Sequence, residues 1–349
     1  MRPKREFRFF PRIKSIAFKR LALIVAVFWC GDAAATARIF TYYAPATARS
    51  FGMGGSGSAD LSDVGNVALN PAVISFANGL RALGIVAPLS LGLIEINSAS
   101  GMLSFGKSVS ARAPSGLRLG VGVGWRHDKF ELGNASTDQS DDMYHISGGG
   151  AYDWAKSRIG LGASLKRVPM TLSNGDDENA TLFDMGILFE AGPFHVSRVS
   201  LVGAAGFSAM NVGDPVIDPL FGSFDALEFR RIGTSVCFFA GVIDSVPVDR
   251  AGLPPRLSMT VSFDVDSAFH TNYESRRQLG FEAAWHTIVF VRAGYVHDGI
   301  LVDGARDGTV GAGLRWTNQR FEAAFDFARW PYYHDIYGNV FGLVLSYDL

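Results

Sequence analysis

Beyond residue 78 the chain alternates large apolar residues with small or polar ones. In the stretch 257–266, Leu, Met, Val and Phe occupy every second position, and Ser, Thr and Asp occupy the positions between them. The stretches 117–126 and 321–328 show a similar alternation, with Gly, Arg, Ala, Glu and Asp on the other side. Since successive side chains of a β-strand point to opposite faces, a period of two predicts strands.

Fourteen segments of this kind follow one another, and an even number is expected of a bacterial outer-membrane barrel. Counted back from the C-terminus, the connections alternate between long stretches, such as 330–339 and 298–307, and short ones, such as 286–287. The connection 242–256 is long where a short turn is expected, so it is either an elaborated loop or a sign of a miscount. The expected strands are 79–91, 94–106, 116–127, 143–154, 157–168, 180–190, 197–210, 226–242, 256–268, 275–286, 287–298, 306–317, 319–329 and 340–349.

The polar face of these strands carries Gly, Ser and charges of both signs, whereas the apolar face carries large aliphatic and aromatic residues. Segments of about ten residues with this arrangement are typical of outer-membrane barrels, in which the apolar side faces lipid and the polar side faces the lumen. We therefore expect an all-β, transmembrane antiparallel β-barrel in the cell outer membrane, with a secreted β-sandwich as the main alternative. The charges expected to face the lumen are Asp264, Asp266, Glu282, Arg292, Arg315, Glu322 and Asp326.

The last predicted strand places Phe341, Leu343, Leu345, Tyr347 and Leu349 on one face. This resembles the C-terminal signal that the barrel-assembly machinery reads in outer-membrane proteins, although those usually end in an aromatic residue. Other aromatic residues gather near predicted strand ends, where the interfacial girdles of membrane barrels lie. They are Trp125, Trp154, Trp285, Trp316, Trp330, Tyr332 and Tyr333.

The first 37 residues are interpreted as a secretory signal peptide, with cleavage expected after Ala37 or, as a second choice, after Ala35. Eight Lys or Arg residues precede the apolar run 21–31, and small residues follow it, in the order typical of such peptides. A membrane anchor is the first alternative, but the run is shorter than the roughly 17–25 residues that span a bilayer. A lipoprotein site at Cys30 is the second, and it would follow the large Trp29 instead of a small residue.

Removal of residues 1–37 leaves an acidic chain, because Lys and Arg fall from 32 to 24 and Asp and Glu from 33 to 31. Such a chain offers no basic face to nucleic acid. Only Cys237 then remains, so neither an intramolecular disulfide nor a cysteine metal site is expected. The acidic stretch 174–179 lacks the spacing of a calcium loop and is interpreted as a solvated loop. With no evident nucleophile–His–acid set, we expect no catalytic residue, metal or cofactor, and an outer-membrane enzyme is the most distant alternative.

The stretch before the first strand is rich in glycine, and Gly52, Gly54 and Gly57 form a G-x-G-x-x-G pattern. A dinucleotide-binding loop would require a buried strand before the pattern and a βαβ unit around it, and the sequence predicts neither. Farther on, Asn70 can cap a helix whose first turn contains Pro71. We expect a compact segment of short helices and turns that folds back into the lumen, because a fourteen-stranded barrel is too wide for its own side chains to fill.

Residues 48–78 resemble the N-terminal hatch of the FadL-type long-chain fatty-acid transporters, which ends in Asn-Pro-Ala. They equally resemble the start of the PorV/PorQ family, with its Arg-x-x-Gly-Met-Gly stretch followed by Asp and by Asn-Pro-Ala. Residues 279–349 favour PorV/PorQ through a Gly-x-Glu strand, an Arg-Ala-Gly-Tyr strand, a Gly-x-Gly strand and an acid-containing strand; the middle of the chain matches only in periodicity. Both families belong to one superfamily of fourteen-stranded barrels. The plug residues that the resemblance implies are Gly52, Met53, Gly54, Asp63, Asn70, Pro71 and Ala72.

These observations divide the chain into a signal peptide (1–37), a hatch or plug (38–78) and a barrel (79–349). In FadL-type proteins the hatch plugs the lumen and a ligand leaves through the barrel wall, which implies binding or passage of small hydrophobic molecules across the outer membrane. In PorV-type proteins the barrel serves type IX secretion, which implies secretion-system proteins as partners. We expect the first function and keep the second as the alternative, with outer-membrane lipid as a partner in both.

Overall fold

The computed structural model describes residues 47–90, 94–108, 115–132, 139–171, 177–197, 199–214, 216–218, 222–224, 228–240, 257–268, 275–298, 305–318, 320–333 and 336–348. The expected signal peptide and the connection 242–256 lie outside the described residues.

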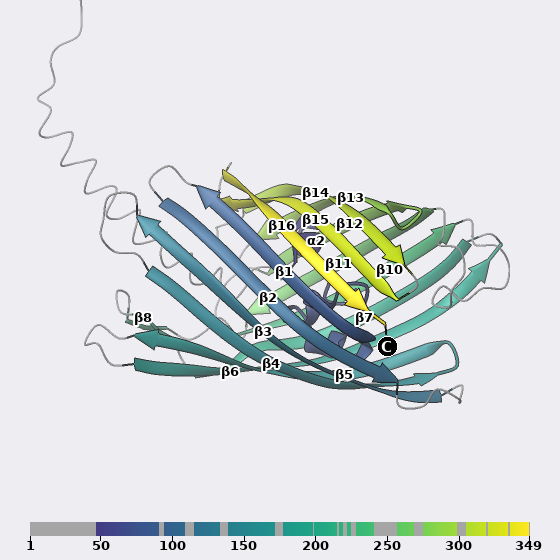
Figure 1. Cartoon of the computed structure of the whole chain (residues 1–349), viewed down its shortest axis with the longest axis horizontal. Helices are drawn as coiled ribbons and strands as arrows, with labels where there is room; N and C mark the ends of the chain where they lie inside the picture. The colour runs from purple at the N-terminus through teal and green to yellow at the C-terminus, as the bar shows by residue number, and fades with distance from the viewer. Residues whose placement is uncertain are drawn as a thin grey trace, which may run out of the picture.

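Fourteen strands close into one antiparallel barrel, in which consecutive strands are neighbours except where the small hairpin β8–β9 is inserted (Figure 1). Each predicted strand corresponds to one strand of the barrel, so the all-β barrel is confirmed and the β-sandwich is excluded. The barrel strands are β1 (Gly79–Ser90), β2 (Ile94–Ser108), β3 (Ser115–Leu132), β4 (Gln139–Trp154), β5 (Ser157–Thr171), β6 (Asp177–Val196), β7 (Val199–Gly213), β10 (Phe229–Ala240), β11 (Leu257–Ala268), β12 (Arg276–Trp285), β13 (Val289–Asp298), β14 (Ala305–Asn318), β15 (Phe321–Tyr333) and β16 (Ile336–Tyr347).

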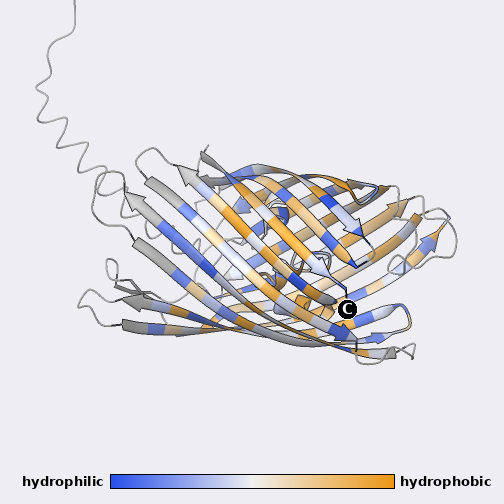
Figure 2. Ribbon diagram, viewed as in Figure 1, coloured by the Kyte–Doolittle hydropathy of each residue, from blue (hydrophilic) through white to orange (hydrophobic). Residues whose placement is uncertain are grey.

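The outward face of the barrel carries the large apolar side chains. On β3, Leu119 and Val121 are 50% and 57% exposed, whereas on β11 the intervening Ser262 and Asp264 are buried. Figure 2 shows apolar residues along the strands of the wall, interrupted by hydrophilic ones. The alternation in the sequence therefore places apolar side chains outside and polar side chains inside.

Three details differ from the sequence prediction. The stretch 330–339, expected to be a long connection, belongs almost entirely to β15 and β16, which still pair at Tyr333–Ile336. A hairpin of β8 (Val216–Asp218) and β9 (Gly222–Phe224) is additional, because strands of three residues are too short to show periodicity. Trp330, expected in an interfacial girdle, is only 3% exposed, since it shares the inward face of β15 with Asp326 and Ala328.

Residues 47–78 form a compact chain of short helices inside the barrel, which we call the inner segment. It contains α2 (Ala48–Gly52) and the 3-10 helices η1 (Val64–Ala68) and η2 (Pro71–Phe76). Helix α2 packs against β13 to β16, and η2 packs against β2 to β6. In Figure 1 the label α2 lies within the ring of strands.

The barrel closes through its shortest strand pairing. Strands β1 and β16 pair from Leu80–Tyr347 to Val86–Phe341, whereas β1 and β2 pair as far as Ser90–Glu95. Among the described residues, positions 87–90 of β1 and 336–340 of β16 pair only with the strand on their other side. Pro88 lies in this stretch, and a proline without an N–H group is tolerated at such an edge.

Candidate functional site

The inner segment rests directly on the backbone of the wall, because glycines lie beneath it. A Cβ atom at Gly120 would lie 1.8 Å from the carbonyl oxygen of Ile74, and one at Gly162 would lie 2.2 Å from that of Pro71. Any side chain at these two positions would therefore lift η2 off the wall. Ser208 adds a direct tie, since its hydroxyl donates to the carbonyl oxygen of Leu69 at 2.9 Å.

The first half of the predicted plug motif lies at the end of α2. The hydroxyl of Thr309 donates to the carbonyl oxygen of Gly52 and accepts from the backbone N–H of Gly54, both at 3.0 Å. Gly54 has a φ of 70°, and a Cβ atom there would lie 2.8 Å from the backbone of Tyr295. The glycines thus permit a turn in contact with the wall, and Met53 is buried beside them.

The second half of the motif caps two short helices. Asp63 accepts from the backbone N–H of Gly65 at 3.0 Å at the start of η1. Asn70 accepts from the backbone N–H of Ala72 at 3.0 Å and donates to the carbonyl oxygen of Ile187 at 3.3 Å, so it both caps η2 and ties it to β6. Pro71 occupies the first turn of η2, where its missing N–H is not needed.

A buried network of charges connects α2 to the wall. Arg49 donates to the two carboxylate oxygens of Glu282 at 2.7 and 2.8 Å, and it also donates to Asp60 within the inner segment. Arg292 donates to Glu282 and to Asp326, both at 2.6 Å. None of the five residues is more than 8% exposed. We call these residues the Arg49 network.

The charged groups of the inner segment respond to this burial. Burial by itself would lower the pKa of Arg49, but the negative charges of Asp60 and Glu282 raise it well above its ordinary value. Burial raises the pKa of Asp63, and the charge of Arg49 opposes this effect in part. The guanidinium of Arg49 is therefore a permanent charge at the centre of the network.

The other predicted lumen charges take separate places. Asp264 accepts from the backbone N–H groups of Gly57 and Ser58 at 3.1 and 2.9 Å, so it also holds the inner segment. Asp266 accepts from Arg231 at 2.7 Å within the wall. Arg315 and Glu322 lie 3.5 Å apart and are partly exposed. The seven predicted residues thus divide among the Arg49 network, a second tie to the segment and two pairs of the wall.

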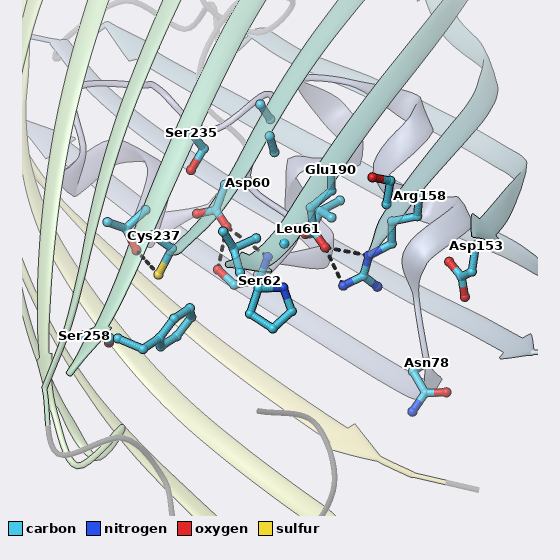
Figure 3. A pocket seen from close by; sticks show the side chains of 18 of the residues that line it. Asp60, Leu61, Ser62, Asn78, Asp153, Arg158, Glu190, Ser235, Cys237 and Ser258 are labelled. Carbon is cyan, nitrogen blue, oxygen red and sulfur yellow. Dashed lines mark hydrogen bonds and ion pairs between the residues drawn. The ribbon is translucent and has the colours of Figure 1, made fainter. Parts of the chain in front are cut away.

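A cavity of about 930 Å³ lies between the inner segment and the end of the barrel that carries the C-terminus, and we call it the vestibule. Figure 3 shows Leu61 and Ser62 of the inner segment among its lining side chains. Arg158 pairs with Glu190 at 2.6 Å on its wall (Figure 3), and Arg118 pairs with Asp153 at 2.7 Å. The vestibule is therefore lined by paired charges and small polar groups together with apolar side chains such as Leu61, Phe239 and Phe290.

Apolar side chains form a further part of the contact between the inner segment and the wall. Phe51 of α2 meets Trp330 of β15 edge to face, with ring centroids 5.1 Å apart. Neighbouring apolar side chains from η1, β1, β2 and β16 complete a buried group that we call the apolar cluster. Its larger members include Phe51, Val64, Val67, Leu83, Ile85, Met102, Trp330 and Val340, and it continues along η2 through Ile74 and Phe76.

Sequence reasoning missed the inner segment's own contribution to the charge network. Arg49 and Asp60 are absent from the predicted site residues, because no local pattern signals a partner 233 positions away from Arg49. In the part of the chain that the structure describes, no three His, Cys, Asp or Glu side chains are arranged to hold a metal ion. Within the same ranges, no helix has the length and apolar character needed to cross a membrane.

No protein-family model and no curated protein sequence matches the chain. Among solved structures, the Pseudomonas putida toluene transporter TodX is 13% identical, with a TM-score of 0.47, over 86% of this chain and 97% of that one. A Pseudomonas aeruginosa FadL homologue is 11% identical, with a TM-score of 0.48, over 86% and 98%. The CymD monoaromatic hydrocarbon channel is 11% identical, with a TM-score of 0.49, over 88% and 98%. Similarity at this level defines neither a ligand nor a family for this chain, and the fold assignment rests on the closed strand order.

Proposed function

We propose that this chain is an outer-membrane barrel plugged by its inner segment, and that it binds or passes small hydrophobic molecules. The observation that carries the proposal is the apolar cluster, in which Phe51 and Trp330 join the plug to the wall. Elsewhere the inner segment is held by charges and hydrogen bonds, which an apolar molecule would not displace, and by η2, which rests on glycines of the wall. The cluster is therefore the part of the plug–wall contact that an apolar molecule can enter by replacing one apolar surface with another.

The outer face of the barrel supports placement in the outer membrane. Leu161, Val291 and Leu314 are each more than half exposed, on strands that lie on different parts of the wall. An apolar outer face of this kind is the surface that faces lipid in outer-membrane barrels. The C-terminal strand presents Phe341, Leu343 and other apolar residues outward, in keeping with recognition by the barrel-assembly machinery.

The way in which the inner segment is held supports the plug role. It is tied to β11 through Asp264, to β12 through Glu282 and to β14 through Thr309. A segment with ties to several strands stays in the lumen of a folded barrel and restricts free diffusion of polar solutes. Passage of a hydrophobic molecule then requires only a local rearrangement at the apolar cluster.

The test is uptake of labelled toluene by cells with the gene intact, deleted or restored. We expect deletion to slow uptake and restoration to recover it. A restored Trp330→Ala variant, which removes the wall side of the Phe51 contact, should differ in uptake from the unaltered protein. A control variant, Trp316→Ala, changes an outward side chain that is 59% exposed and should behave as the unaltered protein does. Toluene uptake that does not depend on the gene would contradict the proposal.

The alternative is a PorV-like adaptor in type IX secretion or surface attachment of exported proteins. The vestibule favours it, because the Arg118–Asp153 and Arg158–Glu190 pairs on its wall offer hydrogen-bonding groups to a polar partner. The same deletion strain separates the two functions. Loss of surface proteins with unchanged toluene uptake would replace the first function with the second.

A further inference from the structure

A small slot lies between η1 of the inner segment and the inner faces of β1 to β6. It has a volume of about 60 Å³ and shares no lining residue with the vestibule. Val67 and Ala68 of η1 form one side of it, and strands of the barrel wall form the other. The slot therefore belongs to the junction between the inner segment and the barrel.

The wall of the slot follows one row of residues that are paired directly across five strands. Leu83 of β1 pairs with Met102 of β2, Met102 with Gly124 of β3, Gly124 with His145 of β4, and His145 with Lys166 of β5. Directly paired residues lie on the same face of a sheet and are close neighbours. Along this row the lining changes from apolar to polar, so the slot has one end of each kind.

His145 sits in the middle of this row because Gly124 has no side chain. A Cβ atom at Gly124 would lie 2.3 Å from Cε1 and 2.5 Å from Nε2 of the imidazole ring, so the ring occupies the space that a side chain would fill. Within the described residues, Nε2 of His145 is buried without a hydrogen-bond partner. Buried polar atoms normally have a partner, so this nitrogen points to one that the protein itself does not supply.

The groups beside His145 have partners of their own. Lys166 donates to the side-chain oxygen of Asn211 at 2.7 Å and lies 2.7 Å from a carboxylate oxygen of Asp184. Arg126, which also lines the slot, pairs with Asp128 at 2.9 Å, so each charge at the slot is paired and no net charge is left to attract an ion. The missing partner of His145 is therefore expected to be a neutral hydrogen-bonding group.

The apolar end of the slot can adapt in size. As it stands, about 60 Å³ is room for a few water molecules. Met102 and Met143 both line the slot, and methionine side chains rotate and repack readily. Met102 lies on β2 and Met143 lies two residues before His145 on β4, so their displacement would enlarge the slot toward the size of a single aromatic ring.

We propose that the slot binds small neutral molecules that have an apolar body and one hydroxyl group, such as phenol. The hydroxyl group bonds to Nε2 of His145, and the ring displaces the side chains of Met102 and Met143. The claim that such molecules are the ones that the barrel passes rests on the proposed function. The claim that the slot binds them is tested separately.

The test is equilibrium dialysis of labelled phenol and labelled benzene against the full-length protein in detergent micelles, with micelles alone as the blank. The unaltered protein should bind phenol about tenfold more tightly than benzene, as expected for one added hydrogen bond to a buried group. His145→Phe should weaken phenol binding about tenfold and leave benzene binding nearly unchanged. The matched control is His127→Phe, because His127 is 40% exposed, bonds to Asp142 and lies outside the slot.

A second variant guards against a folding defect in His145→Phe. Gly124→Ala should displace the imidazole ring and reduce phenol binding in the same direction, and heat-modifiable gel migration reports whether each barrel is folded. Equal binding of phenol and benzene to the unaltered protein, or unchanged phenol binding in His145→Phe, would overturn the inference. Phenol binding without gene-dependent toluene uptake would refute the proposed function alone, and gene-dependent uptake without phenol binding would refute the slot alone.

Discussion

Neutralising Glu282 tests whether the Arg49 network holds the inner segment in place. In the folded protein, Glu282 accepts two hydrogen bonds from Arg49 and one from Arg292. In a Glu282→Gln variant the side chain keeps one acceptor oxygen, but the amide nitrogen replaces the other and faces a guanidinium group. The variant therefore loses the charge that two buried arginines share while retaining the shape of the side chain.

The size of the effect follows from these contacts. Removing one partner of a buried ion pair costs about 3–5 kcal/mol. In Glu282→Gln, Arg49 keeps its bond to Asp60 and Arg292 keeps its bond to Asp326, so we expect a cost near the lower end of this range. At about 1.4 kcal/mol per tenfold change, a loss of about 3 kcal/mol raises the fraction of displaced inner segments roughly a hundredfold. Strand pairing is unaltered, so the barrel itself should remain closed.

The assay is conductance of the purified protein in planar lipid bilayers, with heat-modifiable gel migration to confirm a folded barrel. Glu282→Gln should open far more often than the unaltered protein. The control is Glu322→Gln, because Glu322 forms only a partly exposed pair with Arg315 at 3.5 Å, and such pairs contribute about 0–1 kcal/mol. Equal conductance of Glu282→Gln and Glu322→Gln in folded barrels would refute the anchoring role of the network.

Three further variants probe the contacts of the inner segment. Gly162→Ala should destabilise the packing of η2 by about 1–3 kcal/mol, because the new Cβ meets the carbonyl oxygen of Pro71. The control Gly148→Ala should have no such effect, because a Cβ there has no atom within 4 Å. The rate of proteolysis of the inner segment measures both variants. Asn70→Ala combined with Pro71→Ala should leave the barrel assembled but loosen the plug, and unchanged bilayer conductance would contradict this. Phe51→Ala should weaken the attachment of the inner segment by about 3 kcal/mol or more, because it leaves a cavity beside Trp330. The segment should then be released from the wall at a lower temperature; an unchanged release temperature would show that the ring contact contributes little.

Strand periodicity made the barrel predictable from the sequence, because inward and outward residues alternate regardless of what they contact. The identity of each inward partner was not predictable. Asp326 and Glu282 could be placed on the inner face, but their joint contact with Arg292 depends on strand register, which local pattern does not specify. The prediction for Trp330 was wrong because its aromatic character suggested the membrane–water interface. It lies an even number of positions after Asp326 on the same strand, so its side chain points into the barrel.

The contacts of the early glycines could not be predicted for a similar physical reason. Gly54 needs its backbone freedom to turn against Tyr295 and to bond with Thr309, both contributed by distant strands. The slot at His145 could not be foreseen, since it requires Gly124 to lie opposite His145 across a strand pair. In both cases the sequence contains the residues, and only the register shows what they meet.

Some contacts of the inner segment are with residues near the end of the sequence, and this constrains the order in which the protein can be assembled. The segment comes before every strand, yet Glu282 and Thr309 belong to strands near the end of the chain, and β1 must finally meet β16. Contacts between such distant residues form slowly, because a long stretch of chain must lose conformational entropy before the contacts stabilise it. The segment is therefore attached in two stages: η2 can pack on β2 to β6 as soon as these early strands are in place, whereas α2 gains its contacts only when the last strands of the barrel have been added.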